Sequence, residues 1–156
     1  MEAEIITIGD ELLIGQTVDT NSAYLGQKLG SIGISVSRKT AISDNESAIL
    51  QAIEESQSRC DILIITGGLG PTKDDITKKT LCKYFNCGIR RDDSVIEHLE
   101  KIFAQRGRQL LDTNLVQADL PEACVTLHNA VGTAPGMWFQ QNNKILISLP
   151  GVPVEV

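Results

Sequence analysis

The stretch of sequence that decides the fold runs from Asp61 to Asp75 and reads DILIITGGLGPTKDD. Its residues 62–66 are almost wholly apolar, which is typical of a parallel strand that is covered on both faces. Glycines follow at once, and a helical pattern begins near Asp75. Proteins of the α/β class hold phosphate with this order of elements, because glycine lets backbone N–H groups approach an anion and the helix N-terminus adds a favourable dipole.

Two carboxylates, Asp74 and Asp75, close this loop, although carboxylates repel phosphate. They indicate a bound cation or an acid/base function. Acidic residues in the first turn of a helix are also favoured by the dipole alone, so each has a purely structural interpretation. The loop matches neither a P-loop nor a G-x-G-x-x-G fingerprint, and the residues by themselves leave the reaction open.

The bulk composition is that of one soluble globular domain. The chain has 156 residues, with 42% hydrophobic and 22% charged side chains, enough for a single core. A formal net charge of -6 argues against binding to nucleic acid or to a membrane surface, which both need a basic face. No leader-like or membrane-spanning stretch is visible, so we expect a cytoplasmic protein.

Cys60, Cys82, Cys87 and Cys124 show no C-x-x-C spacing and no pairing with histidine at metal-ligand spacing. Cys82 and Cys87 are a poor zinc candidate, because no further ligand lies near them in the sequence. We expect reduced and mostly buried thiols.

Strands and helices alternate through the first half of the chain. Strands are predicted at 3–9, 34–42 and 62–66, and a loop at 10–15. One helix starts at Asp19 or Thr20 and ends at Gly33, and another follows the cap signal at 43–45. This order predicts a parallel sheet with helices on both faces.

The second half is less regular. A helix ends near 86–88, a second is capped by Asp92 and broken at 106–108, and a short third covers 113–118. We expect a short strand at 125–127, a glycine-containing loop at 131–136, and a hairpin of 137–140 with 144–149. The segment 150–156 resembles a loop, so we expect an N-terminal domain truncated at its C-terminal end.

Ligands of an open parallel sheet bind outside the carboxyl ends of its strands. The predicted strands end at Gly9-Asp10-Glu11, at Asp44-Asn45 and at the glycine loop, so all the acidic candidates fall on one edge. Such a group suits a divalent cation that bridges to a diphosphate, with one carboxylate left to activate water. Asp44 has an alternative role as a helix N-cap, and Glu11 an alternative as a solvated loop residue.

The remaining polar residues carry no clear chemistry. His98 is expected at the surface of its helix, and we assign no chemistry to His128. Lys73 is long enough to reach a phosphate, but we interpret it by default as an exposed loop residue. No Ser-His-Asp or Cys-His arrangement is present in the sequence pattern.

The glycine loop with the following Asp74-Asp75-Ile76-Thr77 resembles the signature of the CinA family of competence/damage-inducible proteins. The N-terminal domain of that family is similar to the MogA/MoaB molybdopterin-binding fold. The resemblance covers nearly the whole chain and rests on these segments: 9–16, 20–21, 44–45, 67–77, 131–136 and 150–153.

The resemblance implies a single three-layer α/β/α domain over 1–156, with a mostly parallel sheet and an antiparallel hairpin. Cofactor-biosynthesis relatives cradle a pterin phosphate in the glycine loop and use acidic residues that match Asp44 and Asp75 for adenylyl transfer. They usually have threonine where Leu69 stands and a basic residue where Asp74 stands. These departures fit the CinA pattern, for which the family implies metal-dependent cleavage of ADP-ribose to AMP and ribose 5-phosphate.

We carry the family's site over to this chain residue by residue. The catalytic candidates are Asp44, Asp75 and Glu11, and the metal candidates are Asp74, Asp75 and Glu11. The ligand-binding candidates are Gly9, Asn21, Gly67, Gly68, Leu69, Gly70, Pro71, Thr72, Gly132, Thr133, Ala134, Pro135, Gly136, Pro150 and Gly151. The expected cofactor is a divalent ion (Mg, Mn, Co or Ni), with potassium as a further ion, and the ligand is a nucleotide or a pterin.

Two alternatives stay open: a molybdopterin-binding or adenylyl-transfer domain, and a non-catalytic regulatory module of a larger CinA protein. We also expect a homo-oligomer. Longer family members carry a C-terminal nicotinamide-mononucleotide deamidase domain, and we do not assign that activity to these 156 residues.

Overall fold

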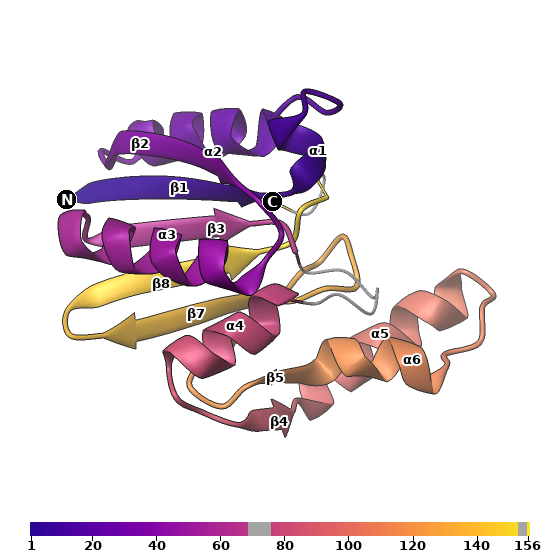
Figure 1. Cartoon of the computed structure of the whole chain (residues 1–156). Coiled ribbons are helices and arrows are strands. Elements are labelled where there is room, and N and C mark those ends of the chain that lie inside the picture. Colours follow the sequence, from indigo (N-terminus) through magenta and orange to yellow (C-terminus); the bar gives the residue numbers. More distant parts are fainter. Residues whose placement is uncertain (69–75, 153–155) are drawn as a thin grey trace.

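The computed structural model describes residues 1–68, 76–152 and 156. Its main feature is a six-stranded sheet with the order β2-β1-β3-β8-β7-β6 (Figure 1). The strands are β1 (Glu2–Ile8), β2 (Ser35–Ile42), β3 (Ile62–Thr66), β6 (Val125–Leu127), β7 (Gly136–Gln141) and β8 (Lys144–Leu149). The pairs β2–β1, β1–β3 and β3–β8 are parallel, and β7 runs antiparallel to both β8 and β6.

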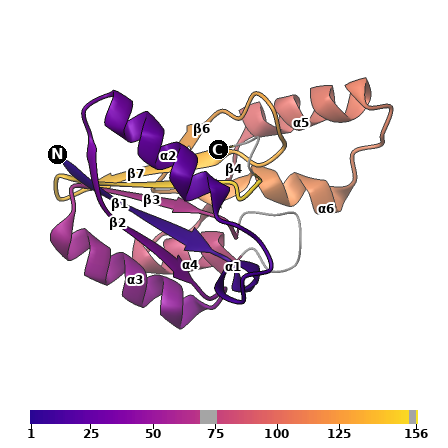
Figure 2. The same cartoon turned by 90° about the horizontal axis from the view of Figure 1, so that it is seen from above.

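Helices cover both faces of this sheet (Figure 2). The first four are α1 (Asp10–Leu13), α2 (Thr20–Ser31), α3 (Glu46–Arg59) and α4 (Ile76–Tyr84). Leu25 and Leu29 of α2 pack with Ile5 on one face, whereas α3 and α4 bury their apolar side chains with Ile6 on the other. Because side chains alternate along a strand, β1 contributes side chains to the hydrophobic cores on both faces of the sheet. The predicted α/β/α architecture and the fully buried central position of β3 are confirmed.

Residues 89–121 form a smaller unit whose two strands the sequence did not reveal. It contains β4 (Ile89–Arg91), α5 (Asp93–Gln105), α6 (Asp112–Leu115), a 3₁₀ turn (Val116–Ala118) and β5 (Asp119–Pro121). The strands β4 and β5 pair antiparallel in a sheet of their own. Each has three residues, which is too short for alternating hydrophobicity to be recognised.

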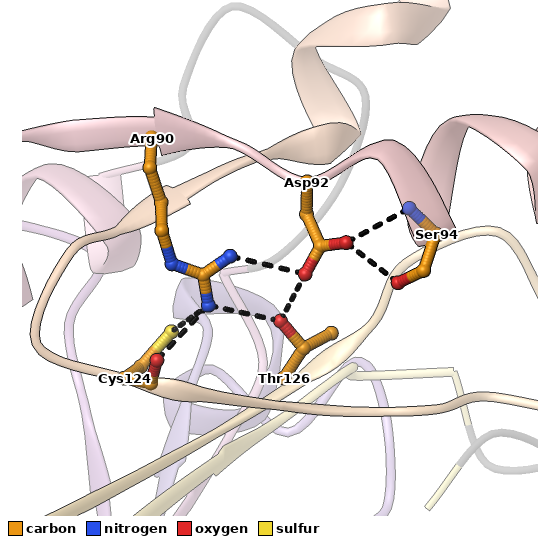
Figure 3. A network of polar contacts seen from close by, with 5 residues as sticks. All are labelled: Arg90, Asp92, Ser94, Cys124 and Thr126. Carbon is orange, nitrogen blue, oxygen red and sulfur yellow. Dashed lines mark hydrogen bonds and ion pairs between the residues drawn. The ribbon is translucent and has the colours of Figure 1, made fainter.

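A network of polar side chains ties this smaller unit to the main sheet (Figure 3). Arg90 donates to Asp92 at 3.0 Å and to Thr126 of β6 at 3.1 Å, and Thr126 donates to Asp92 at 2.5 Å. Asp92 also caps α5, as predicted, by accepting from the Ser94 backbone N–H at 3.0 Å. Hydrogen bonds from Ser94, then Thr126 and Arg90, hold the pKa of the Asp92 carboxyl well below its usual range.

Two local expectations need correction, and a third is confirmed. Residues 10–13, expected as a loop, form the short helix α1, because the N–H of Ile14 donates to the Asp10 carbonyl at 3.1 Å and closes a helical turn. The predicted helix 113–118 is divided into α6 and the 3₁₀ turn. The predicted hairpin is confirmed, with Asn142 and Asn143 both at positive φ, as a two-residue turn requires.

All four cysteines are free thiols; Cys60 and Cys124 are buried, and Cys82 and Cys87 are half-buried. Within the described residues, no helix is both long enough and apolar enough to cross a membrane.

Candidate functional site

The carboxyl ends of β1, β3 and β8 meet through close contact of their backbones. Gly67, directly after β3, has a φ of 103°, and a Cβ there would lie 2.4 Å from the Ile8 carbonyl oxygen. A Cβ on Gly151, after β8, would lie 3.0 Å from the Gly67 Cα. Only glycine fits at position 67, because the Ile8 backbone leaves no room for a side chain and a positive φ strains other residues; at position 151 a side chain would press on the Gly67 backbone. The predicted edge is therefore a place where three loops converge (Figure 1).

The start of α2 braces this convergence. The Asn21 side-chain amide donates to the Gly151 carbonyl at 2.9 Å and to the Thr66 hydroxyl at 3.2 Å. Thr66 in turn donates to the Pro150 carbonyl at 2.9 Å. Asn21 and Pro150 thus lie at the expected edge, and Asn21 fastens the loop after β8 to β3. Thr66 was not among the candidates, because a threonine inside an apolar run looks like an ordinary strand residue.

The helix cap before Asn21 is Asp19, a half-buried acid. Asp19 accepts from the Ser22 backbone N–H at 3.0 Å and from the Thr7 hydroxyl at 2.8 Å. Burial raises the pKa of Asp19, but the hydrogen bonds from Ser22 and Thr7 outweigh it, and the net pKa is lowered. Asp19 is therefore structural, since its oxygens are committed to the cap and to β1.

Glu11 folds back over the end of β1. A Cβ on Gly9 would lie 2.4 Å from the Glu11 Oε1 atom, so the carboxylate occupies the space that the missing side chain of Gly9 leaves. Gly9 itself is buried and donates to the Ile42 carbonyl at 3.1 Å. Both residues lie at the sheet edge where the sequence placed them.

Asp10 brings the loop after β2 to the same edge. Its Oδ1 atom accepts from the Ser43 hydroxyl at 2.7 Å and from the Asp44 backbone N–H at 3.3 Å. Asp10 and Glu11 in α1, and Asp44 in the loop after β2, therefore lie at the ends of neighbouring strands, as the strand-end argument predicts. The N-cap alternative for Asp44 is wrong: Asn45 caps α3 by accepting from the Ala48 N–H at 2.9 Å.

The beginning of the glycine loop rests against the first turn of α4. Gly68 has a φ of 67°, and a Cβ there would lie 2.0 Å from the Thr77 hydroxyl. That hydroxyl donates to the Gly67 carbonyl at 3.4 Å. Thr77 is fully buried and was missed as a supporting residue. The remaining candidates of this loop lie outside the described residues: Leu69, Gly70, Pro71, Thr72, Lys73, Asp74 and Asp75.

Asn129 organises the second glycine-containing loop. Its side-chain oxygen accepts from the backbone N–H groups of Val131 and Gly132, both at 3.1 Å, and its amide donates to the Ala134 carbonyl at 2.9 Å. One side chain thus fixes the path of residues 131–134, including the candidate Thr133. The sequence signal for Asn129 is the tendency of Asn to bond its own backbone two or three residues on.

This loop is anchored at both ends. His98 of α5 donates from Nε2 to the Gly132 carbonyl at 2.9 Å, and because a carbonyl only accepts, that nitrogen carries the proton. His98 is half-buried and packs edge-on against the His128 ring, with the two ring centroids 4.6 Å apart. Its expected position at the surface is therefore wrong. Gly136 lies beside Leu149 of β8, where a Cβ would meet Leu149 Cδ2 at 3.2 Å. Pro135 and Gly136 are buried and lead directly into β7.

The donors on this edge are carboxylate oxygens, which suit hard divalent ions such as Mg²⁺ or Mn²⁺. Within the described residues, no three ligand side chains form a group that could hold a metal ion. Glu11 and its neighbours can therefore supply part of a ligand set and need further ligands.

Comparison with known proteins settles the family. A family model described as "Probable molybdopterin binding domain" matches residues 4–156. A CinA-like protein of Cytophaga hutchinsonii is 52% identical over 99% of this chain, and the chain spans 37% of that protein's length. The crystal structure of the protein CinA from Thermoplasma acidophilum superposes with a TM-score of 0.85 at 36% identity, over 99% of this chain and 90% of the other.

This chain belongs to the CinA family. Its fold is also that of MoaB: the molybdopterin biosynthesis enzyme of Thermus thermophilus superposes with a TM-score of 0.60 at 19% identity, over 97% of this chain and 82% of the other. The expected membership of the CinA family is thereby confirmed, and so is the mostly parallel sheet with an antiparallel part. In this CinA-family domain the three converging loops and the anchored second loop form the candidate site.

Proposed function

We propose that this CinA-family domain hydrolyses the diphosphate of ADP-ribose in a reaction that needs a divalent metal ion. Water adds across the P–O–P bridge, and the products are AMP and ribose 5-phosphate. The observation that carries the proposal is the position of Asp10, Glu11 and Asp44 at the ends of the neighbouring strands β1 and β2. There the Asp44 N–H donates to Asp10, and the Glu11 carboxylate lies against Gly9.

Charge is the reason to favour a diphosphate with a cation over a simple anion. Backbone N–H groups at glycine positions attract phosphate, whereas carboxylates a few ångströms away repel it. A bound divalent ion reconciles the two, because it neutralises the diphosphate and polarises its P–O bonds. The carboxylates of Glu11, Asp74 and Asp75 would bind the divalent ion. Potassium would be a second bound ion.

The other roles follow from position. Gly67, Gly68 and the loop 132–136 would line the phosphate site by close approach of their backbone. The N–H groups of Gly67 and Gly132 already donate to the Leu149 carbonyl at 3.2 Å and to the Asn129 side chain at 3.1 Å, so the phosphate donors would be other N–H groups of these loops. Asp44 would orient or deprotonate the attacking water, because its loop is tied to α1 by the 3.3 Å hydrogen bond from its N–H to Asp10.

The test is direct product analysis. The folded chain is incubated with ADP-ribose and with Mg²⁺, Mn²⁺, Co²⁺ or Ni²⁺, with and without K⁺, and the nucleotides are separated by ion-exchange chromatography. We expect AMP and ribose 5-phosphate in equal amounts with at least one metal, and none with a chelator. A folded chain that releases no AMP with any of these ions contradicts the proposal.

A matched pair of variants separates site chemistry from net charge. Glu11→Gln removes a carboxylate from the edge, and Glu100→Gln removes one from an exposed position of α5. Loss of a side chain that only supports a metal ligand already costs roughly 10- to 100-fold in metal affinity or activity, so loss of a ligand should cost at least as much. We therefore expect such a loss in the first variant and unchanged turnover in the second.

The family model supports a second candidate, a domain that binds molybdopterin through the same loops. Tight pterin binding without cleavage of ADP-ribose would favour it. A non-catalytic module is the third candidate, and it predicts that Asp75→Asn changes neither ligand affinity nor turnover. Measuring binding of both ligands to the wild type and to this variant distinguishes all three.

A further inference from the structure

Two cysteines, Cys82 and Cys87, lie close together at the C-terminal end of α4, which is the opposite end of that helix from Gly68. The N–H of Cys87 donates to the Cys82 carbonyl at 3.0 Å, and the N–H of Asn86 donates to the Lys83 carbonyl at 3.2 Å. Asn86 has a φ of 48°. These two bonds around a left-handed residue define a Schellman motif, in which the residue after the left-handed one returns to the third residue from the helix end.

The side chains of the two outer residues frequently contact each other in this motif, and here both are thiols that lie close enough to interact. The Cys82 Sγ atom lies 3.9 Å from the Gly88 carbonyl oxygen, directly beyond Cys87. The turn between them is held in place, because Phe85 stacks on Phe139 of β7 with ring centroids 4.3 Å apart. The two sulfurs are therefore kept near each other by backbone hydrogen bonds and by packing.

We propose that Cys82 and Cys87 form a reversible redox site, which a small-molecule disulfide oxidises to an intramolecular disulfide bond. Both thiols are half-buried, whereas Cys60 and Cys124 are buried, so a small reagent reaches this pair more readily than the others. The site is separate from the glycine edge and does not rest on the function proposed above.

The order of attack follows from the environments of the thiols. Burial, and next the neighbouring Cys87 thiol, raise the pKa of Cys82 to about 11, and burial also raises the pKa of Cys124. Both therefore stay protonated near neutral pH and react slowly, since the thiolate is the nucleophile. Cys87 is left as the thiol that starts the exchange.

The exchange balances without any further reactant. The Cys87 thiolate attacks a disulfide RSSR, forms a mixed disulfide Cys87–S–SR, and releases one RS⁻. Cys82 then loses its proton and attacks the Cys87 sulfur, which forms the Cys82–Cys87 bond and releases the second RS⁻. The two thiol protons end on the two RS⁻ groups, so two cysteine thiols and one RSSR become one disulfide and two RSH.

Trypsin makes the proposal easy to test, because it cuts after Lys79, Lys83 and Arg90 and thus between the two cysteines. The native chain is incubated with oxidised glutathione, blocked with N-ethylmaleimide, digested, and analysed by mass spectrometry. We expect peptides 80–83 and 84–90 joined as one species that lacks two hydrogens, and separated by dithiothreitol. Each of the other cysteines falls in its own peptide, 60–73 or 109–144, so the partner in any disulfide can be identified.

Two variants identify which cysteines form the disulfide. Cys60→Ser should leave the joined peptides unchanged, and Cys82→Ser should leave glutathione attached to Cys87. Peptides 80–83 and 84–90 that stay apart in the wild type, unmodified or each carrying glutathione, would overturn the proposal. A bond from either cysteine to peptide 109–144 would overturn it as well.

Discussion

The six-stranded sheet and the smaller unit of residues 89–121 are joined to their surroundings in different ways. At the carboxyl edge of the main sheet, loops meet through backbone contact at glycines, as at Gly67 and Gly151. The smaller unit is held to β6 by charged and hydroxyl side chains, with Arg90 and Asp92 at the centre. Glycine contact brings the backbones together with no side chain between them, whereas the polar network places charged and hydroxyl side chains between the two units. The candidate site is the one at the glycine edge.

The largest expected effect is a change at that edge. In Gly67→Ala the new Cβ would lie 2.4 Å from the Ile8 carbonyl oxygen, which is closer than van der Waals contact allows. The substitution also forces alanine to a φ of 103°. We expect a loss of about 3 kcal/mol or more in the free energy of unfolding, or no folded protein. Urea unfolding followed by circular dichroism measures it.

Gly30→Ala is the matched control. Gly30 lies within α2, and a Cβ there meets nothing within 4 Å. Alanine should stabilise that helix by about 0.5–1 kcal/mol. Equal losses in the two glycine variants would contradict the claim that backbone contact holds this edge together.

A smaller loss is expected from the network that holds the second unit. Asp92→Ala removes the N-cap of α5 and the acceptor for Arg90 and Thr126. We expect about 2 kcal/mol of lost stability, from one cap and from hydrogen bonds to a charged group. The neighbouring exposed Asp93→Ala, measured in the same urea titration, should cost much less. If Asp93→Ala costs as much, the network is not what joins the two units.

The second glycine-containing loop should respond mainly in ligand binding. Asn129→Ala removes the side chain that fixes residues 131–134, with a stability cost of about 1 kcal/mol. If these residues bind the ligand, the dissociation constant for ADP-ribose should rise about tenfold by calorimetry, because the loop must be ordered on binding. Gln109→Ala, an exposed amide elsewhere, is the control and should bind as the wild type does. Unchanged affinity in Asn129→Ala would remove this loop from the site.

The smallest expected effect is on how the free energy of unfolding depends on pH in the acid range. The pKa of Asp92 is lowered in the folded protein, so the unfolded chain takes up a proton at higher pH than the folded one. The stabilisation is complete above about pH 5 and is lost as the pH falls through about 4 and below. In Asp92→Asn the unfolding free energy should fall less steeply over that range. Asp19 and Glu4, whose pKa values are also lowered, keep part of the slope in both proteins.

The same contrast explains what could be predicted from the sequence. Strand β3 has five buried residues in a row, and the hairpin turn carries two asparagines, so both have strong local signals. The strands β4 and β5 have three residues each and owe their pairing to contacts distant in sequence, such as Arg91 with Asp119 at 2.7 Å. Nothing local marks them.

The candidate site divides in the same way. Strand ends and acidic residues can be located from the sequence, and this placed Glu11 and Asp44 on one edge. The supports of that edge depend on the packing of distant segments, as with Thr77 under Gly68 and His98 against Gly132. A histidine among charged neighbours in a helix gives no sign that a loop 34 residues away will accept a hydrogen bond from it.

The most direct measurement is a crystal of this chain soaked with Mn²⁺ and the methylene analogue of ADP-ribose, which cannot be cleaved at the bridge. The account predicts the diphosphate of the analogue against Gly67, Gly68 and residues 132–136, with an anomalous manganese peak bound by the Glu11 carboxylate. The analogue seated away from the carboxyl ends of β1, β3 and β8, or manganese bound without any of Glu11, Asp44, Asp74 and Asp75, would contradict it.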